Sequence, residues 1–285
     1  MPKFLFPGKT TDKTVYLHEL TQKDYKNFSK TIINNDINCL NIFVNELLEE
    51  LAYNKEDVKN LDNIDKLLLL LDIRNYCISP IIEFKESNKS YEIDLNDVIS
   101  AINNIDYQKY FLYKDNNIFC KASLPQQLIY NKIEDMFADC LIELKINNEI
   151  VNIDFNNDKK RQIVDRLPPQ LLGNYTNYVN KTNSILQKTV LIDIPPEIAK
   201  QTFYLSSAGE EIIQLIGLCF YLDLSTTYQN EYQLVRNFKF TSNQINCTVP
   251  AELNLYYKFV KDEIRESKKD DKPQGTYMPS KFGVD

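Results

Sequence analysis

Histidine is the side chain that most often performs acid-base catalysis near neutral pH, and this chain has one, His18. It lies just before a segment with the pattern of an amphipathic helix. Catalytic roles need a partner group held beside the imidazole, and no neighbouring residue in the sequence suggests one. We therefore interpret His18 as a partly exposed residue at the entry to a helix.

Six cysteines are the next candidates for reactive or metal-binding chemistry. Zinc sites take three or four Cys, His or carboxylate ligands at short spacing. These cysteines are scattered and form no CxxC pair: Cys39, Cys77, Cys120, Cys140, Cys219 and Cys247. No secretory signal is expected before them, because Pro7-Gly8 interrupts the apolar start of the chain. We predict reduced, mostly buried thiols in a cytosolic product, with no metal and no cofactor.

Gly-rich phosphate-binding loops and pairs of catalytic carboxylates are two further kinds of site that a sequence can indicate. Neither GxGxxG nor GxxxxGK[ST] occurs, so the sequence has no Gly-rich phosphate loop. Carboxylates are plentiful, but Glu49-Glu50 and Glu210-Glu211 fall in predicted helices, where a solvated face or a helix N-terminus accounts for them. Two carboxylates that converge in a cleft stay open as an alternative. On balance, the residues predict a protein that is not an enzyme.

Charge and hydropathy argue against two classes of partner. The formal net charge is -7, and the basic runs Lys159-Lys160-Arg161 and Lys268-Lys269 sit beside acidic residues, which disfavours nucleic-acid binding. The longest apolar runs, Leu67 to Leu71 and Ile212 to Leu222, are far shorter than the roughly 20 residues that a membrane span needs. We expect a folded globular protein with no nucleic-acid partner and no membrane span.

The first third of the chain predicts short alternating elements. We expect a strand over 14–17 and helices over 21–33, 39–51 and 64–77. A hairpin over 81–95 and a fourth helix over 98–102 follow. Thr21 and Asp24 form a cap pair for the first helix. Asp62 or Asn63 caps the buried third helix, whose five leucines mark it as core, and Asn96 or Asp97 caps the fourth.

A shift of sixty residues aligns this plan with the middle of the chain. The offset pairs Leu68 with Leu128, Ile82 with Ile142, Glu83 with Glu143, Asp94 with Asp154 and Asn96 with Asn156. A duplicated helix-hairpin unit explains these matches, and so does chance in a chain of biased composition. If the unit is duplicated, residues 64–96 and 124–156 follow the same path.

The middle of the chain ends in helices and a double proline. Helices are predicted over 159–167 and 171–186, separated by Pro168-Pro169. The alternation of Thr189 to Ile194 predicts a strand, and Pro195-Pro196 then gives the best candidate for a domain boundary.

Residues 206 to 269 have the densest helix-start signals. Ser207 with Glu210 matches a capping box before the apolar helix Ile212 to Leu222. A second helix is predicted from the cap Ser225, with an apolar face formed by Tyr228, Tyr232 and Val235.

Two more helix starts complete this module. Thr241 with Gln244 is another capping box, and Pro250 occupies the first turn of the last helix, where its missing N-H costs nothing. The face of that last helix is formed by Leu253, Tyr257, Val260 and Ile264.

The tail after Lys269 has a different composition. Four Pro and Gly residues disfavour regular structure, yet the tail keeps Tyr277, Met278 and Phe282. We interpret it as an interaction arm, with a frayed terminus as the alternative. The predicted division is 1–110 and 111–194 for the two helix-hairpin units, 195–269 for a C-terminal helical module and 270–285 for the tail.

Tyrosine is abundant, with 18 Tyr and no Trp. Tyrosine is favoured at protein interfaces because it buries a large ring and keeps a polar tip. Several tyrosines lie in polar segments: Tyr107, Tyr110, Tyr113, Tyr175, Tyr178, Tyr204 and Tyr228. The alternative is that this chain uses Tyr in its core, where other proteins use Leu or Trp.

Two regions of the sequence match a family pattern. The C-terminal match comprises Asn230 to Leu234, Phe238 to Thr241, Ile245, Val249 to Leu253, Tyr256-Tyr257 and the charged end Lys261 to Lys268. The N-terminal match comprises Tyr16-Leu17, Leu20, Tyr25 to Phe28, and Leu67 to Arg74 followed by Ile81 to Lys85. This pattern resembles the baseplate hub proteins of T-even type contractile-tailed bacteriophages. The resemblance implies a non-enzymatic protein that helps to build the hub, and it supplies no catalytic residues.

We therefore expect an α+β, mainly helical protein with two helix-hairpin units and a C-terminal helical module. Its expected function is that of a structural or assembly protein of a phage tail baseplate hub. It would bind other tail and hub proteins and be located in the virion after assembly in the host cytoplasm. The residues predicted to bind partners are Tyr257, Tyr277, Met278 and Phe282. The alternatives are a small cytosolic enzyme with a carboxylate pair and a host-directed binding protein.

Overall fold

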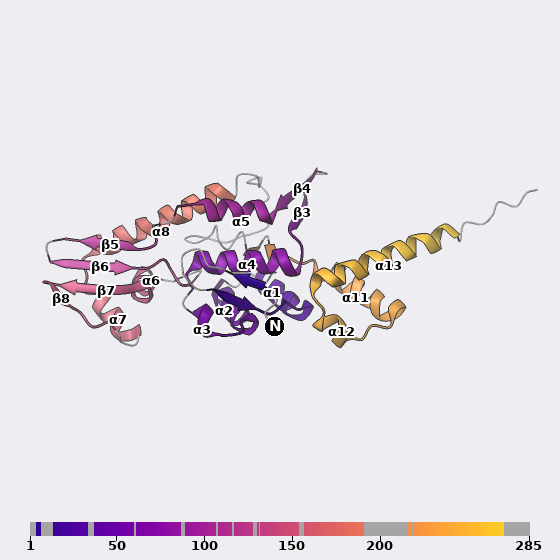
Figure 1. Cartoon of the computed structure of the whole chain (residues 1–285), viewed down its shortest axis with the longest axis horizontal. Coiled ribbons are helices and arrows are strands. Elements are labelled where there is room, and N and C mark those ends of the chain that lie inside the picture. Colours follow the sequence, from indigo (N-terminus) through magenta and orange to yellow (C-terminus); the bar gives the residue numbers. More distant parts are fainter. Residues whose placement is uncertain are drawn as a thin grey trace, which may run out of the picture.

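The computed structural model has an α+β, mainly helical architecture, which confirms the expected fold class. It describes residues 4–6, 14–33, 37–59, 61–86, 89–106, 108–115, 117–127, 130, 132–153, 157–190, 216–217 and 219–270. The molecule is elongated (Figure 1), with a sheet lobe at one end, a helical body in the middle and a C-terminal helical module at the other end.

The helical body is formed by the first part of the chain. Its helices are α1 (Gln22–Ile33), α2 (Ile37–Leu51), α3 (Glu56–Lys59) and α4 (Asn63–Cys77), and β1 (Phe4–Phe6) pairs antiparallel with β2 (Val15–Leu17). The predicted cap pair of α1 is confirmed, because the Thr21 backbone N-H donates to Asp24 Oδ2 over 3.2 Å and the Asp24 N-H donates to Thr21 Oγ1 over 3.3 Å.

Helix α4 forms the centre of the body. Asp62 caps it, because its Oδ1 accepts from the N-H groups of Ile64 and Asp65 over 3.1 and 3.0 Å. Leu67 to Leu71 are all buried, so neighbouring elements cover the helix on several sides. The buried Arg74 donates from Nε to the Cys219 carbonyl over 2.6 Å, which ties α4 to a segment far along the chain.

The predicted hairpin after α4 is confirmed. Strand β3 (Ile81–Glu86) pairs antiparallel with β4 (Lys89–Asp94), and α5 (Leu95–Asn104) follows directly. The cap of α5 is Asp94, whose Oδ1 accepts from the Asn96 N-H over 2.9 Å. The predicted cap, Asn96 or Asp97, was wrong because the helix begins earlier, at the end of the strand.

The sheet lobe contains four antiparallel strands in the order β5-β6-β7-β8. Their bounds are β5 (Phe111–Lys114), β6 (Ile118–Ala122), β7 (Leu141–Ile146) and β8 (Glu149–Ile150). Helices α6 (Ile133–Cys140), α7 (Asn157–Val164) and α8 (Pro169–Val190) complete the lobe. Tyr175 of α8 packs on Phe111 and Phe137, with ring centroids 5.4 and 4.9 Å apart, and so joins α8 to the sheet and to α6.

The strand predicted at 189–194 is wrong where it can be checked. Thr189 and Val190 belong to α8, because no proline interrupts the helix between Pro169 and Pro195. Residues 191–215 lie outside the described residues, and with them the predicted boundary at Pro195-Pro196 and the Ser207–Glu210 capping box. Of the predicted helix 212–222, residues 216–217 and 219–220 are helical.

The offset of sixty residues relates some elements and not others. Strand β7 (Leu141–Ile146) lies sixty residues after β3 (Ile81–Glu86) at both its first and its last residue. Each of the two strands pairs with the strand that follows it in the chain. The helices before them differ, because α4 has 15 residues and α6 has 8. Both helix-hairpin units are therefore present, and their common origin stays a hypothesis.

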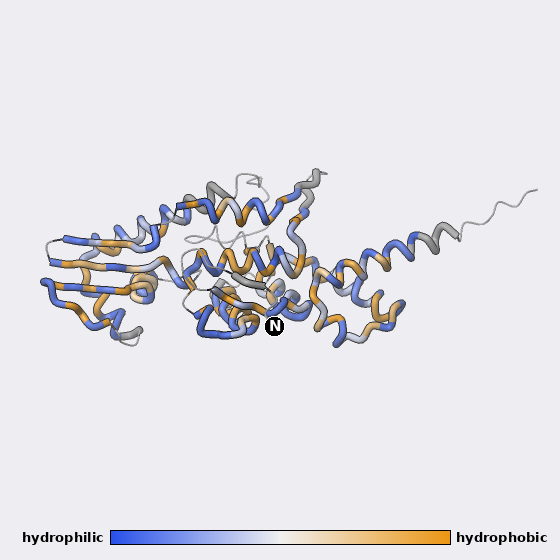
Figure 2. Tube along the Cα trace, in the orientation of Figure 1, coloured by the Kyte–Doolittle hydropathy of each residue, from blue (hydrophilic) through white to orange (hydrophobic). Residues whose placement is uncertain are grey.

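Apolar side chains form two separate clusters. The large cluster runs from Val15 to Phe220 and joins the body to the sheet lobe. A small second cluster belongs to the C-terminal module alone. Figure 2 shows hydrophobic positions recurring along the part of α13 nearest the body, where they supply part of this second cluster. The expected boundary after residue 110 divides parts that share one core, and it stays a prediction.

Candidate partner-binding surface

The C-terminal module consists of α11 (Leu224–Phe238), α12 (Ser242–Cys247) and α13 (Pro250–Asp270). Asp223 caps α11, with Oδ1 accepting from the Ser225 and Thr226 N-H groups over 3.0 and 3.2 Å. The predicted cap Ser225 was wrong, because the aspartate two residues earlier takes these donors. The capping box at α12 is confirmed, since both reciprocal bonds between Thr241 and Gln244 are present.

Few side chains hold the module together. Its core contains Leu234, Ile245, Leu253, Tyr257 and Val260, with Phe240 packed against them. The predicted face of α13 is thus confirmed at its three described positions, and Ile264 lies among side chains that the structure does not describe. Such a small core gives the module little stability of its own, so its contacts with the body matter.

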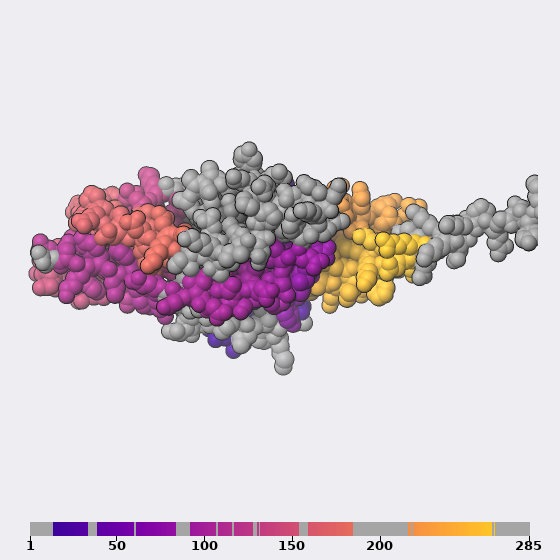
Figure 3. Space-filling view, turned by 90° about the horizontal axis from the view of Figure 1, so that it is seen from above, coloured from indigo at the N-terminus to yellow at the C-terminus, as the bar shows by residue number. Residues whose placement is uncertain are grey.

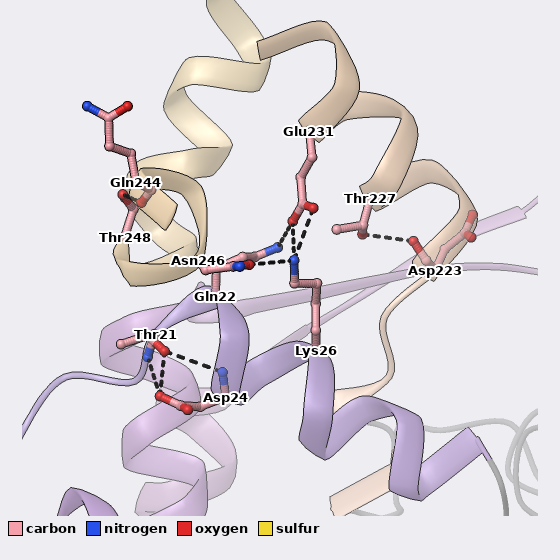
Figure 4. Close-up of polar contacts among 10 residues, drawn as sticks. All are labelled: Thr21, Gln22, Asp24, Lys26, Asp223, Thr227, Glu231, Gln244, Asn246 and Thr248. Atoms are coloured by element: carbon pink, nitrogen blue, oxygen red, sulfur yellow. Dashed lines mark hydrogen bonds and ion pairs between the residues drawn. The ribbon is translucent and has the colours of Figure 1, made fainter. Parts of the chain in front are cut away.

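The module joins the body through a polar junction with α1 (Figure 4). The Lys26 ammonium group lies 3.0 Å from both carboxylate oxygens of Glu231 and donates to Asn246 Oδ1 over 2.9 Å. Gln22 Nε2 donates to Glu231 Oε1 over 3.1 Å, and the Gln22 backbone N-H donates to the Thr248 carbonyl over 2.9 Å. Glu231 thereby receives hydrogen bonds from two side chains of α1.

The charged pair at this junction is largely removed from water. The side chains of Lys26 and Glu231 are 10% and 12% exposed. Burying two charges has a large desolvation cost, which close contact and additional hydrogen bonds offset. A buried pair of this kind fixes the orientation of two packed parts more than it adds net stability.

Other contacts extend the junction on the side of the body. Ser29, one turn after Lys26 on α1, accepts from the Leu222 N-H over 3.0 Å. The Tyr25 hydroxyl donates to the Tyr221 carbonyl over 3.2 Å. Helix α1 therefore contacts both the segment Tyr221-Leu222, which leads into the module, and α11 itself.

Large apolar side chains are exposed on two helices of the module. On α11 and α13 they are Tyr228, Tyr232, Val235, Phe238, Leu255, Tyr256 and Phe259. The most exposed are Phe259 at 65%, Leu255 at 61% and Tyr232 at 59%. Side chains of this kind gathered on one small module are typical of a surface that binds another protein.

The exposed side chains of α11 differ from the predicted packing. Tyr228, Tyr232 and Val235 were identified as its apolar face, yet the side that packs inward has Thr227 and Leu234. Lys26 Nζ lies 5.5 Å from the centroid of the Tyr228 ring, so this face borders the polar junction.

A small polar cavity lies between α2, α3 and α4. Its volume is about 170 Å³, and its lining residues are Asn45, Leu48, Glu49, Val58, Lys59, Lys66, Gln126 and Gln127. Lys66 is buried and donates from Nζ to Asn45 Oδ1 over 2.7 Å and to the Gln126 carbonyl over 2.6 Å. Burial lowers the pKa of Lys66 to about 8.

This cavity offers limited chemistry. Among the described residues, Glu49 is the one carboxylate that lines it, so the cavity supplies no carboxylate pair. The part of the chain that the structure describes brings no three His, Cys, Asp or Glu side chains together as a candidate metal site. The cavity therefore gives no support to the alternative of an enzyme with a carboxylate pair.

The residues singled out from the sequence lie in different places. Tyr257 is 9% exposed inside the small core, and its hydroxyl has no hydrogen-bond partner among the described residues. In this arrangement the ring stabilises the module, and its role in partner binding stays a prediction. Tyr277, Met278 and Phe282 lie outside the described residues. His18 is exposed and stacks on Tyr53, with ring centroids 3.8 Å apart.

The cysteines and the other tyrosines differ in how deeply they are buried. All six cysteines are free, and most are buried. Burial raises the pKa of Cys77 to about 11 and that of Cys219 to about 12, so these thiols stay protonated and unreactive. Tyr175 and Tyr178 are core residues, which favours the composition-based interpretation for them, whereas Tyr228 is exposed.

The junction residues were not predicted from the sequence pattern. Gln22, Lys26 and Ser29 follow i, i+4, i+7 spacing on α1, and all three are buried against the C-terminal part of the chain. This polar stripe was the available signal, but solvated stripes look the same in a sequence. In the described part of the chain, no helix is both long and apolar enough to span a bilayer.

Comparisons with protein-family models, curated protein sequences and solved structures gave no match to this chain.

Proposed function

We propose that this chain is a structural or assembly protein of the tail baseplate hub of a contractile-tailed phage, and that it acts by binding other tail proteins. It would assemble in the host cytoplasm and be located in the tail baseplate. The exposed apolar side chains of the C-terminal module support the protein-binding part of this proposal, because large rings are presented to solvent on a module at one end of the molecule (Figure 1).

The sequence resemblance to T-even type hub proteins supports the same proposal. Two of the resembling stretches, Tyr25 to Phe28 and Asn230 to Leu234, contain Lys26 and Glu231 of the polar junction. A third, Val249 to Leu253, starts α13. The resembling residues thus include those that position the exposed helices.

The test is to identify what the protein binds during infection. The affinity-tagged chain, expressed in infected host cells, should co-purify with other tail proteins, as identified by mass spectrometry. Disruption of its gene should leave cells without complete contractile tails in electron micrographs. Normal tails from the disrupted gene, or co-purification with host proteins alone, would contradict the proposal, and the second result would favour a host-directed binding protein.

A further inference from the structure

The outer side of α13 combines apolar and acidic side chains in one stripe. Glu252, Tyr256, Phe259 and Glu263 follow i, i+4, i+7, i+11 spacing, so they line up along the helix, with Leu255 beside them. All five side chains are exposed. We call this set the outer stripe of α13.

Basic residues occupy a different side of the same helix. Lys258, Lys261 and Arg265 follow i, i+3, i+7 spacing and are also exposed. Asp262 lies between the two sides and pairs with Arg265 at 3.8 Å. The buried positions Leu253, Tyr257 and Val260 face the module core. The charges on α13 are therefore segregated, with carboxylates at both ends of the exposed apolar stripe.

We propose that the outer stripe of α13 binds a basic amphipathic helix of a partner protein. The apolar side chains Leu255, Tyr256 and Phe259 span just over one helical turn, and with Glu252 and Glu263 the stripe spans about three turns, a length along which another helix can pack. Lys or Arg side chains beside the partner's apolar residues would meet Glu252 and Glu263, which selects the partner by charge. This inference rests on the proposed protein-binding role and specifies the chemistry of the partner.

The charges disfavour two other occupants. In a symmetric pair of two copies through this stripe, carboxylates would face carboxylates. The chain's own tail, residues 271–285, has two Lys, two Asp and four Pro or Gly in its sequence, so it matches neither a basic nor a helical partner. A separate basic helix is the occupant that satisfies both the apolar stripe and its acidic ends.

Helix α13 runs from the body toward one end of the molecule (Figure 1). The helix extends away from the body beyond α11 and α12 (Figure 1). Seen from above, the module protrudes at one end of the molecule (Figure 3). The stripe begins near the body, because Thr248, two residues before α13, accepts from the Gln22 N-H of α1, and it runs from there toward the protruding end of the helix (Figure 1).

The test uses the full chain and two synthetic helical peptides with the same leucine spacing, one flanked by Lys and the other by Glu. Fluorescence anisotropy at moderate salt should show the Lys peptide binding at least about tenfold more tightly. Phe259→Asp should weaken that binding roughly thirtyfold. The double variant Glu252→Lys/Glu263→Lys should reverse the preference, and Lys258→Ala, on the basic side, should change it by less than about twofold.

Three results would overturn the inference: no binding of the Lys peptide, equal binding of both peptides, or self-association of the free protein that Phe259→Asp abolishes in sedimentation velocity. Circular dichroism of each variant should stay unchanged, because these side chains are exposed. The melting temperature should stay unchanged for Phe259→Asp and Lys258→Ala and fall by a few degrees at most for the double variant, because Glu252 lies in the first turn of α13, where a positive charge is unfavourable. Failure here, with tail proteins still co-purified, refutes only the basic-helix partner. Peptide binding without tail proteins refutes only the phage assignment.

Discussion

Lys26 and Glu231 are 205 residues apart in the sequence and form an ion pair in the folded chain. Both charged groups are largely shielded from water. The Lys26 ammonium group has three acceptor atoms, two on Glu231 and one on Asn246, which matches its three donor hydrogens. The pair is therefore satisfied only when α1, α11 and α12 are all in place. This requirement makes the junction specific in geometry even if its net contribution to stability is small.

Removing one member of this pair should destabilise the protein more than removing both. We expect Lys26→Met to lower the free energy of unfolding by about 3 kcal/mol, because it leaves a buried carboxylate without its counter-charge. The double variant Lys26→Met/Glu231→Leu should recover most of that loss. Urea denaturation and amide hydrogen exchange of α11 would measure both effects.

Lys30→Met is the matched control for Lys26→Met, because Lys30 is exposed one turn later on the same helix. It should change the free energy of unfolding by less than about 0.5 kcal/mol. Equal effects of Lys26→Met and Lys30→Met would show that the junction does not stabilise the docked module.

Lys66 should make stability depend on pH in the alkaline range. Its pKa in the folded protein is about 8, below the ordinary 10.5, so the unfolded chain binds this proton more tightly. The contribution of Lys66 to stability therefore rises as pH increases from about 8 to 10.5, and the full penalty is present below pH 8. The rise should be roughly 3 kcal/mol at most.

Chemical denaturation of the wild type and Lys66→Met across this range isolates the effect. The difference in free energy of unfolding, wild type minus variant, should increase with pH. Lys59→Met is the control, because Lys59 borders the same cavity but is exposed, and its difference curve should lack this increase. A flat curve for Lys66→Met would mean that the buried amine is not held with a lowered pKa.

At the scale of elements, the sequence predicted helices well and their packing unevenly. Pro250 and the spacing of Leu253, Tyr257 and Val260 identified both the start of α13 and its buried face. For α11 the same reasoning selected the exposed side, because Tyr228 and Tyr232 outweigh the small Thr227 in any hydropathy pattern. Amphipathicity locates an apolar stripe, but a stripe that binds a partner and one that fills a core have the same period.

The polar junction could not be predicted from the sequence for a related reason. Gln22 and Lys26 are polar, and their burial depends on Glu231, whose position relative to α1 is set by the fold rather than by local spacing. The early start of α5 at Leu95, capped by Asp94, and the extension of α8 to Val190 are smaller differences of the same origin. Local signals place most element boundaries within a few residues, and tertiary contacts decide the rest.

The assignment of faces on α13 can be tested with two leucines two positions apart. Leu253→Ala should lower the free energy of unfolding of the module by about 3 kcal/mol, because it leaves a cavity in a core of few side chains. Leu255→Ala should change it by less than about 0.5 kcal/mol, because that side chain is already exposed. Similar losses for both variants, measured by hydrogen exchange of α13, would contradict the assigned faces.

At the scale of the whole molecule, apolar packing and polar docking have separate places. One large core joins the body and the sheet lobe, and the C-terminal module has its own small core. The polar junction between them orients the module and leaves its apolar outer faces exposed. The exposed apolar side chains of the module thus lie at one end of an elongated molecule (Figure 1), apart from the large core.

The tail that follows α13 should act in binding and not in stability. Its sequence has Pro273, Gly275, Pro279 and Gly283, which cannot supply a helical hydrogen-bond ladder, so burial against a partner is what would offset its ordering entropy. Removal of residues 270 to 285 of this chain should leave the melting temperature unchanged and weaken co-purification with the proteins of the phage tail. Apolar burial of about 25 cal/mol per Å² would be lost from that complex.

A full-length variant with Tyr277, Met278 and Phe282 changed to Ser separates side-chain contacts from chain length. If these side chains bind the partner, the triple variant should lose as much co-purification as the truncation. The outer stripe of α13 remains in both variants, so residual binding should persist, and Phe259→Asp added to the truncation should remove it. Full partner binding by the truncated protein would show that the tail is not an interaction arm.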